Sequence, residues 1–402
     1  MTFDTTELYN VCSSFSGDRC SLFEIATWKN GLPFKKINIS DSGTPIIKIA
    51  ELKNGISGAT SYTNQIFDEE VHLHKGDLLF SWSGNPETSI DIFKFELEEG
   101  WLNQHIFKIT PDEKKVDRDY FYFMMKYLKP RFVQIATNKQ TTGLGHVTVA
   151  DIKRITITLP CIEFQKKLVS YLKPLDDKIR LNMKINENLD QQAQTIFVQE
   201  FLSQSSIPDD WKEGSLLDIA DYLNGLAMQK FRPADNEIGL PVLKIKELRQ
   251  GSCDSSSEFC SPSIKPEYII HDGDVIFSWS GSLLVDFWCG GACGLNQHLF
   301  KVTSQKYDKW FYYAWTKHHL DHFVTVAADK ATTMGHIKRD ELTKAEVLIP
   351  NSADYSRIGS LLQPIYELII TNRIENKKLV GLRETLLPQL MSGHIDVSNI
   401  NL

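Results

Sequence analysis

Apolar residues recur at alternating steps of four and three along residues 162–203, in the middle of the chain. The positions are Leu168, Leu172, Leu175, Ile179, Leu189, Ala193 and Ile196, with the polar Asn182 and Asn186 between them. This heptad spacing is typical of a helix that packs one narrow stripe against another helix. Adding 190 to these numbers gives a second seam, made of Ile358, Leu362, Ile365, Ile369, Asn372, Asn376, Leu379, Arg383 and Leu386. The pattern predicts that the chain carries this helix twice.

Each helical segment contains a proline, Pro174 in the first and Pro364 in the second. Proline is tolerated in the first helical turn, where acidic side chains such as Asp176 and Asp177 also suit the helix dipole. We therefore expect a short helix over 162–172 and a long one over 174–202. The same pair should recur over 353–362 and 364–391.

The two long helices should pack antiparallel, because the chain returns to the second helix through an equivalent unit. Pairing centred between the asparagines would place Asn182 opposite Asn376 and Asn186 opposite Asn372. Buried polar seam residues fix the register of a coiled coil. The expected helix-pairing seam consists of Leu175, Ile179, Asn182, Asn186, Leu189, Ile365, Ile369, Asn372, Asn376 and Leu379.

The repeat extends to short segments rich in Ile, Val, Phe and Trp, which read as strands bounded by turn residues. GDLLFSWSG at 76–84 recurs as GDVIFSWSG at 273–281, and LNQHIFK at 102–108 recurs as LNQHLFK at 295–301. Aromatic-rich helices are expected over 119–129 and 309–322. The sequence thus predicts an α+β fold with two repeated globular units and two long helices. We place the units at 1–161 and 204–351 and the helical regions at 162–203 and 352–402. Residues 1–20 have no equivalent in the second copy, and no role is assigned to them.

Composition and charge narrow the functional classes. The chain has 402 residues, 42% of them hydrophobic, and 44 basic against 51 acidic residues give a net charge of −7. The N-terminus lacks the pattern of a signal peptide, and no apolar stretch is long enough to span a membrane. The seven cysteines form no disulfide framework, so we expect reduced thiols and a cytoplasmic protein. Since no segment is a basic domain, any DNA binding must use local patches and a partner.

No set of catalytic residues stands out. A DNA methyltransferase would need an Asn/Asp-Pro-Pro-Tyr/Phe loop, which Asn85-Pro86-Glu87 does not supply. Glu51-Leu52-Lys53 looks like the end of a nuclease motif, but no acidic strand precedes it. His318 and His322 have a metal-ligand spacing on a predicted helix, but no third ligand is nearby. We expect no catalytic residue, no metal and no cofactor in this chain.

These repeated motifs resemble the specificity subunits of type I restriction–modification systems over nearly the whole chain. The resemblance rests on the Gly-Asp-x-Leu/Ile-Phe-Ser-x-Ser-Gly strand, the Pro208–Trp211 segment, the helices after Pro160 and Pro350, and the ending LLPQLMSG at 386–393. It implies two target-recognition domains, each reading half of a split double-stranded DNA site. It also implies binding to two methylation subunits, which hold S-adenosylmethionine, and through the complex to restriction subunits. Residues 1–20 depart from the usual start of the family.

Residues that discriminate between two half-sites should differ between the copies. Asn103-Gln104 and Asn296-Gln297 have side chains that can bond adenine, but they are identical and are therefore expected to be scaffold. Readout is expected from the divergent intervals 32–44 and 226–240, 53–73 and 249–270, and 84–101 and 281–294. Lys139-x-Thr-Thr and its copy at 330–333 suit either a phosphate contact or a solvated turn. The DNA-binding candidates are Lys35, Lys36, Lys53, Ser83, Asn85, Lys139, Thr141, Lys230, Arg232, Arg249, Ser282, Lys330 and Thr332.

The length of the long helix sets an expected gap between the half-sites. About 29 residues span ~43 Å at ~1.5 Å per residue, which corresponds to about 10–13 base pairs. Two other hypotheses stay open. One is a non-catalytic scaffold whose paired domains bind proteins or another ligand. The other is an enzyme with catalytic residues in the divergent intervals. The pattern does not specify the DNA sequence that is read.

Overall fold

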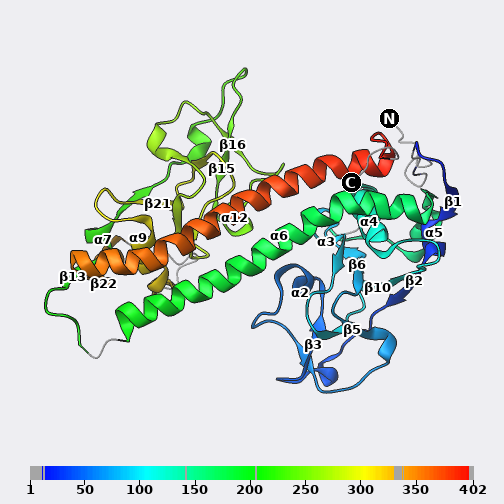
Figure 1. The fold of residues 1–402 in the computed structure, drawn as a ribbon, viewed down its shortest axis with the longest axis horizontal. Helices are drawn as coiled ribbons and strands as arrows, with labels where there is room; N and C mark the ends of the chain where they lie inside the picture. Colours follow the sequence, from blue (N-terminus) through cyan, green and yellow to red (C-terminus); the bar gives the residue numbers. More distant parts are fainter. Residues whose placement is uncertain are drawn as a thin grey trace. The chain divides into compact units, whose positions relative to one another are not determined.

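The computed structural model describes residues 11, 14–140, 143–203, 206–329, 337 and 339–397. The chain forms two compact units, one within Met1–Asp176 and Gly381–Leu402, the other within Asp177–Val380. The two long helices, α6 (Ile162–Phe197) and α12 (Ser352–Ser392), each contribute to both units (Figure 1). The division therefore falls inside the helices, and the domain boundaries expected from the sequence stay a prediction.

The first unit is built on two four-stranded sheets and two strand pairs. The first sheet is antiparallel and has the order β2 (Ala26–Asn30), β10 (Ile106–Pro111), β6 (Leu78–Ser81) and β8 (Asp91–Lys94). The second has the order β4 (Tyr62–Thr63), β3 (Thr44–Ile47), β9 (Glu99–Leu102) and β5 (His72–His74), with β3 and β9 parallel. The antiparallel pairs are β1 (Asp18–Ser21) with β12 (Thr156–Leu159), and β7 (Ser83–Gly84) with β11 (Gly145–His146).

Short helices connect these strands, and one longer helix covers the first sheet. The short ones are η1 (Leu22–Ile25), η2 (Lys36–Asn38), α2 (Ile49–Asn54), η3 (Glu69–Val71), α3 (Pro86–Ser89) and α5 (Val149–Arg154). The long one is α4 (Arg118–Asn138), which continues past the predicted end at Lys129 and through Pro130. It does so because Phe132 and Ile135 in its last turns are buried in the core, and this packing outweighs the cost of an internal proline.

The second unit repeats the two four-stranded sheets and the first of the two strand pairs. Its first sheet has the order β14 (Asp221–Asn224), β21 (Leu299–Thr303), β18 (Val275–Ser278) and β19 (Leu284–Phe287). Its second sheet has the order β16 (Phe259–Cys260), β15 (Leu240–Leu243), β20 (Cys293–Leu295) and β17 (Ile269–Ile270). The strands β13 (Lys212–Ser215) and β22 (Glu346–Ile349) form the equivalent of the first pair. Repeated sequence segments thus become repeated strands.

Helices of the second unit follow the same order. The short ones are α7 (Leu216–Ile219), η5 (Met228–Lys230), α8 (Ile245–Gln250), η6 (Pro266–Tyr268) and α11 (Arg339–Lys344). The aromatic segment predicted as one helix over 309–322 is two helices, α9 (Lys309–His318) and α10 (Leu320–Asp329). The prediction of a single helix was therefore wrong, and His318 and His322 lie on different helices.

Aromatic side chains fill the main core of each unit. In the first unit Trp28 packs edge-on against Phe80, Phe107 and Phe121. In the second, Tyr222 takes the equivalent place against Phe277 and Phe300. Burial of such large apolar surfaces provides most of the stabilisation of each unit.

The predicted helix breaks at Pro174 and Pro364 are wrong, because α6 and α12 run through both prolines. Proline leaves the carbonyl four residues earlier without its helical donor, and in both helices that residue is a serine. The Ser170 hydroxyl donates to the Lys167 carbonyl at 2.7 Å, and the Ser360 hydroxyl to the Arg357 carbonyl at 2.6 Å. Leu168, Leu172, Ile358 and Leu362 are fully buried on the N-terminal side of the prolines, so tertiary packing keeps each helix continuous. A π-helix, η4 (Val198–Leu202), ends the first helix.

Residues 14–20, which belong to the segment without an assigned role, close the first unit. The Ser14 hydroxyl donates to the carbonyl of Gly393 at 2.7 Å and Ser392 at 3.1 Å, at the end of α12. Phe15 packs against Phe164 with ring centroids 5.5 Å apart. The N-terminal segment therefore caps the C-terminal helix of its own unit.

Candidate nucleic-acid interface

The residues shared by the two copies make the same scaffold contacts in each unit. The Trp82 indole donates to the Asn30 side-chain oxygen at 3.0 Å, and the Trp279 indole to that of Asn224 at 3.1 Å. Ser81 and Ser278, which precede the tryptophans, are fully buried. The Ser-Trp-Ser-Gly repeat therefore orders the end of its strand.

A half-buried ion pair also recurs behind this strand. The Lys108 ammonium lies 3.0 Å from Asp77 and donates to the His72 carbonyl at 2.7 Å. In the second unit the Lys301 ammonium lies 2.8 Å from Asp274 and donates to the Ile269 carbonyl at 3.1 Å. These lysines link the two sheets of each unit and are not available to DNA.

The Asn-Gln segments occupy a close backbone crossing, as expected for scaffold. A Cβ at Gly31 would lie 2.2 Å from the Asn103 carbonyl oxygen, and one at Gly225 would lie 2.3 Å from that of Asn296. Only glycine fits against these carbonyls, because real Cβ contacts are never this short. The signal for this crossing was present in the sequence as Asn-Gly-Leu at 30–32 and 224–226, and it was missed.

The carboxylates that suggested a nuclease remnant serve as buried caps. Glu51 is 8% exposed and accepts hydrogen bonds from the Lys48 backbone and the Thr60 hydroxyl. Glu247 is 3% exposed and accepts the equivalent bonds from Lys244 and Ser257. A buried carboxylate saturated by such donors holds the loop after it and is closed to a metal ion or substrate.

Cations of the first divergent interval lie exposed on short helices. Lys35 and Lys36 are exposed at η2, and Lys230 is exposed at the end of the equivalent η5. No ion pair joins these three to any described residue, whereas the Arg232 guanidinium lies 3.9 Å from Glu258. Large apolar side chains are also exposed in this part of each unit: Ile37 and Ile66 in the first, and Phe231, Ile238 and Phe259 in the second. Exposed cations beside apolar tips suit contacts to phosphates and base methyl groups.

Lys53 and Arg249 occupy equivalent positions in the last turns of α2 and α8, where both are exposed. Partial burial and the neighbouring Lys129 lower the pKa of Lys53. An anion that approaches a lysine beside a second cation stabilises the charged form of that lysine. Both residues remain candidates for phosphate contact.

Other candidates already have structural partners. Ser83 is buried and its hydroxyl lies 2.9 Å from His146 Nδ1, while the Asn85 side chain caps α3. The Lys139 ammonium pairs with the buried Asp151, and the Ser282 carbonyl accepts a hydrogen bond from the Ser278 hydroxyl. This geometry favours a structural role for these four. Thr141, Lys330 and Thr332 lie outside the described residues.

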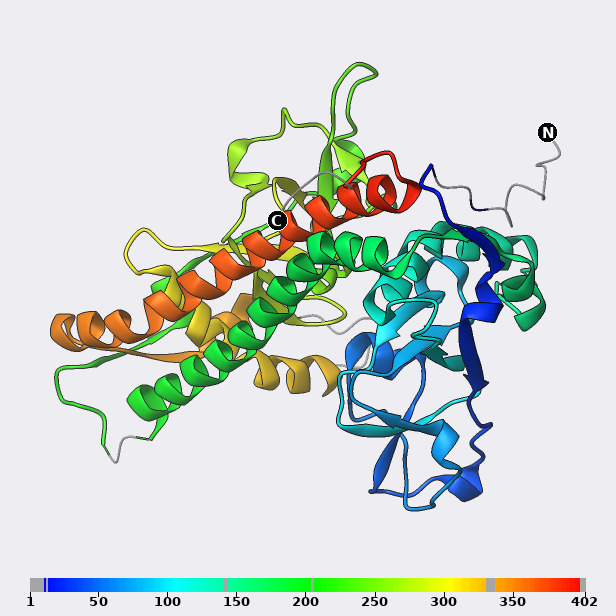
Figure 2. The same cartoon turned by 45° about the vertical axis from the view of Figure 1, so that its right-hand side comes forward.

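The polar seam between the long helices has the register expected from the sequence. Within the second unit α12 runs beside α6 in both views (Figures 1 and 2). The Asn182 amide donates to the Asn376 side-chain oxygen at 2.8 Å, and the Asn372 amide to that of Asn186 at 2.9 Å. Asn182 also donates to Glu375 at 2.7 Å. The pairing of low with high numbers makes the helices antiparallel.

The seam position that breaks the repeat belongs to the first unit. Arg383 stands where the first helix has Ala193, and its guanidinium lies 2.7 Å from Asp176. Leu175, Ile179, Leu189, Ile365 and Leu379 are half-buried along the seam, and Ile369 is buried. The seam is therefore apolar at most positions and polar at a few specific ones.

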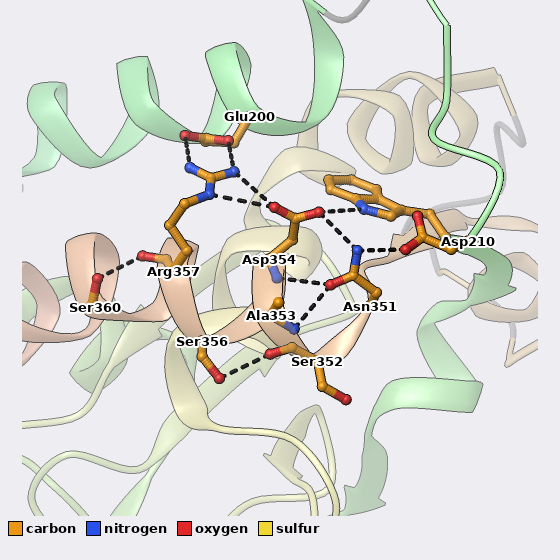
Figure 3. A network of polar contacts seen from close by, with 10 residues as sticks. Glu200, Asp210, Asn351, Ser352, Ala353, Asp354, Ser356, Arg357 and Ser360 are labelled. Atoms are coloured by element: carbon orange, nitrogen blue, oxygen red, sulfur yellow. Dashed lines mark hydrogen bonds and ion pairs between the residues drawn. The ribbon is translucent and has the colours of Figure 1, made fainter.

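A polar network holds the start of α12 in the second unit (Figure 3). Arg357 binds Glu200 through two parallel hydrogen bonds of 2.7 and 2.8 Å and also reaches Asp354. The Trp211 indole donates to Asp354 at 3.1 Å, and the Asn351 side chain accepts from the first backbone amides of the helix. The bond from Arg357 lowers the pKa of Glu200, and the bond from Trp211 lowers that of Asp354. Together these hydrogen bonds connect three parts of the chain, which are η4, the segment that precedes β13, and the start of α12.

Comparison with known proteins shows to which family this chain belongs. The family profile described as "Type I restriction modification DNA specificity domain" matches twice, over residues 20–191 and 208–380. The chain belongs to the type I restriction–modification DNA specificity family. Each of its two specificity domains runs from a globular part into the long helix that follows, so the family suggested by the repeated motifs is confirmed.

Relatives agree with this assignment, and a solved structure shares the fold. The MjaIX specificity subunit of a type I restriction enzyme from Methanocaldococcus jannaschii is 24% identical over 320 residues, covering 74% of this chain and 73% of the relative. The MjaVIII specificity subunit of the same organism is 22% identical over 392 residues, covering 89% of this chain and 87% of the relative. The crystal structure of a type I restriction–modification S subunit from M. genitalium has a TM-score of 0.54 at 13% identity and covers 94% of this chain and 96% of that chain.

The predicted fold class of two repeated domains with antiparallel long helices is thus confirmed. These relatives are named as specificity subunits of restriction enzymes, which agrees with the prediction of a recognition subunit rather than an enzyme. Within the described residues, no helix is long and apolar enough to cross a membrane.

Proposed function

We propose that this specificity subunit reads a split double-stranded DNA site, one half with each specificity domain. The observation that carries the proposal is the division between shared and divergent residues. The two domains share the Trp–Asn hydrogen bond and the strand order of their two sheets. Their exposed loops differ in the cations and apolar tips that they present. Two domains with one scaffold and two different loop sets suit two different half-sites.

Phosphate contacts are assigned to the exposed cations Lys35 and Lys36 in the first domain and Lys230 in the second. Each phosphate contact that is removed should lower the salt dependence of binding by about one unit of slope. In the assembled complex, Lys35→Ala combined with Lys36→Ala should weaken DNA binding and lower the slope by about two. Lys344→Ala, which removes an exposed cation already paired with Glu341, is the matched control and should leave the slope unchanged. An unchanged slope in the double variant would rule out these contacts.

The chain needs partners to bind DNA tightly, because its net charge is −7 and phosphate neutralisation supplies much of the affinity. Two methylation subunits that carry S-adenosylmethionine would complete the DNA clamp, and restriction subunits would join through this complex. Binding should be weak for the isolated chain and sequence-specific once methylation subunits are added. A fluorescence-anisotropy titration at physiological salt measures the affinity for DNA of the isolated chain and of the chain with methylation subunits. Tight specific binding by the chain alone would contradict the proposal.

The long helices are assigned the role of ruler between the half-sites. One heptad inserted into both helices preserves the seam and lengthens each helix by roughly 10 Å, or about three base pairs of duplex. Methylome sequencing should then find the same half-sites with a longer spacer. A three-residue insertion is the matched control, because it shifts the seam out of phase. An active heptad variant with the original spacer would show that another element sets the distance.

A further inference from the structure

One edge of the second sheet in the first unit gathers two histidines and two glutamates. His72 and His74 lie two residues apart on β5 and therefore on one face, while Leu73 between them points into the core and is fully buried. The neighbouring strand β9 places Glu99 directly opposite His74. The short helix η3 brings Glu69 to the same face. The adjacent elements η3 and β5 thus meet β9, which is distant in the sequence, at one point.

The distances among these groups are those of a metal site. His72 Nδ1 lies 3.4 Å from one Glu69 carboxylate oxygen, and His74 Nε2 lies 3.8 Å from the other. One ligand atom each from Glu69, His72 and His74 lies within 4.8 Å of the other two. Bonds of about 2.0–2.2 Å to a tetrahedral Zn²⁺ place neighbouring ligand atoms roughly 3.4 Å apart. A small movement of the His74 side chain toward Glu69 is enough for the three ligand atoms to surround an ion.

A second carboxylate, that of Glu99, lies beside the His72 nitrogen that faces away from Glu69. Histidines that bind a metal through one nitrogen usually donate the other N–H to a carboxylate, which fixes the tautomer. His72 Nε2 is buried and has no hydrogen-bond partner within the described residues, and the Glu99 carboxylate lies 3.4 Å away. The His72 ring also stacks on Trp101, with centroids 4.5 Å apart and planes 22° from parallel. The imidazole is thereby held with its Nδ1 toward Glu69.

We propose that Glu69, His72 and His74 bind a Zn²⁺ ion, with Glu99 orienting His72. Two imidazole nitrogens and one carboxylate oxygen are a ligand set that Zn²⁺ accepts readily, with an open fourth position for water. The ion ties η3, at the end of the divergent interval 53–73, to β5 beside β9. It therefore stabilises a variable loop of the first domain.

The second domain shows that the scaffold does not require these residues. By the strand register, His72 and Leu73 correspond to Ile269 and Ile270, so His74 corresponds to His271. Counting from the same strand, Glu69 corresponds to Pro266, and the residue that corresponds to Glu99 is Ala292. Only one of the four groups remains, so the cluster is particular to the first domain and His271 provides a matched control.

Zinc titration of the full-length purified chain, freed of metal with a chelator, tests the proposal. One equivalent should bind, and His74→Ala and Glu69→Gln should each lower the affinity at least tenfold, while His271→Ala binds like the wild type. Both substituted side chains are more than half exposed, so the variants should fold, which circular dichroism checks. Co²⁺ in place of zinc should show the visible absorption of a tetrahedral site without a thiolate charge-transfer band. The proposal is overturned by an absence of saturable binding, by equal affinity in the His74→Ala variant, or by a cobalt–thiolate band.

Discussion

The two specificity domains share one fold, in which some equivalent contacts are made by the same residues and others by different residues. The Trp–Asn hydrogen bond and the Lys–Asp ion pair are identical in kind and in sequence. At the start of the long helices the contact is kept while the residues change. The Gln165 side chain accepts from the backbone of Asp117, and the Tyr355 hydroxyl accepts from that of Asp308. Both bonds tie the long helix to the residue that precedes α4 or α9.

A third class of position keeps neither the residue nor the contact. The first domain meets its long helix through the Phe15–Phe164 ring pair, whereas the second uses the Trp211–Asp354 hydrogen bond. Of Glu69, His72 and His74, only His74 has an equivalent in the second domain, which is His271. Comparison within one chain therefore separates residues that the fold demands from those that are free to vary. Only the free ones can give two domains different DNA preferences.

The largest effect is expected where both domains demand the same residue. Gly31→Ala and Gly225→Ala each place a methyl group against a backbone carbonyl that has no room to move. Each should lower the free energy of unfolding of its own unit by about 3 kcal/mol. Gly58→Ala is the control, because a Cβ there meets no atom within 4 Å. Denaturant unfolding measures the changes, and a variant as stable as the wild type would show that the crossing is not tight.

A smaller effect of opposite sign is expected at the seam. Replacing Asn182, Asn186, Asn372 and Asn376 by leucine removes two buried and two half-buried amides and should stabilise the second unit by about 2 kcal/mol. The register should loosen at the same time, because the paired amides no longer specify it. Spin labels at the exposed positions 183 and 371 should then give a broader distance distribution. Met183→Leu, outside the seam, is the control for stability. A destabilised variant with an unchanged narrow distribution would contradict this role.

The smallest effect concerns the network around Arg357 in the second domain. Arg357→Met should cost about 1 kcal/mol at pH 7, a modest value because the guanidinium is half exposed. Arg357 holds the pKa of Glu200 below its ordinary 4.5, so its contribution is present above that pH and is lost as the pH falls through the lowered pKa. The stability difference between wild type and variant should therefore shrink as the pH falls below 4.5 and through the lowered pKa. Lys344→Met, at an exposed ion pair within one helix, should change little at either pH. A difference that is constant with pH would show that Arg357 acts by packing.

Repetition made much of this fold predictable. The heptad seam, repeated at a fixed offset, predicted the antiparallel asparagine pairs. The repeated strands predicted the α+β domains. The rule that proline ends a helix gave wrong predictions at Pro130, Pro174 and Pro364. The three helices continue through these prolines because tertiary packing stabilises them.

The functional residues were less predictable, for a physical reason. Whether Ser83 or Lys139 is free depends on partners 63 and 12 residues away, and no short-range pattern encodes those partners. The cluster of Glu69, His72 and His74 lies within six residues of the sequence and was missed, although only its outer carboxylate, Glu99, comes from another strand. Lys35, Lys36 and Lys230 lie exposed in intervals that differ between the copies, and their contact with DNA stays a prediction.

Exchange of one domain tests the division of labour most directly. Residues 204–351 would be replaced by the same region of a related specificity subunit, and the recognised site would be read by methylome sequencing of cells that carry the complete complex. One half of the site should change to that of the donor, while the other half and the spacer length stay as they were. A change in both halves would contradict the conclusion that each domain reads its own half-site.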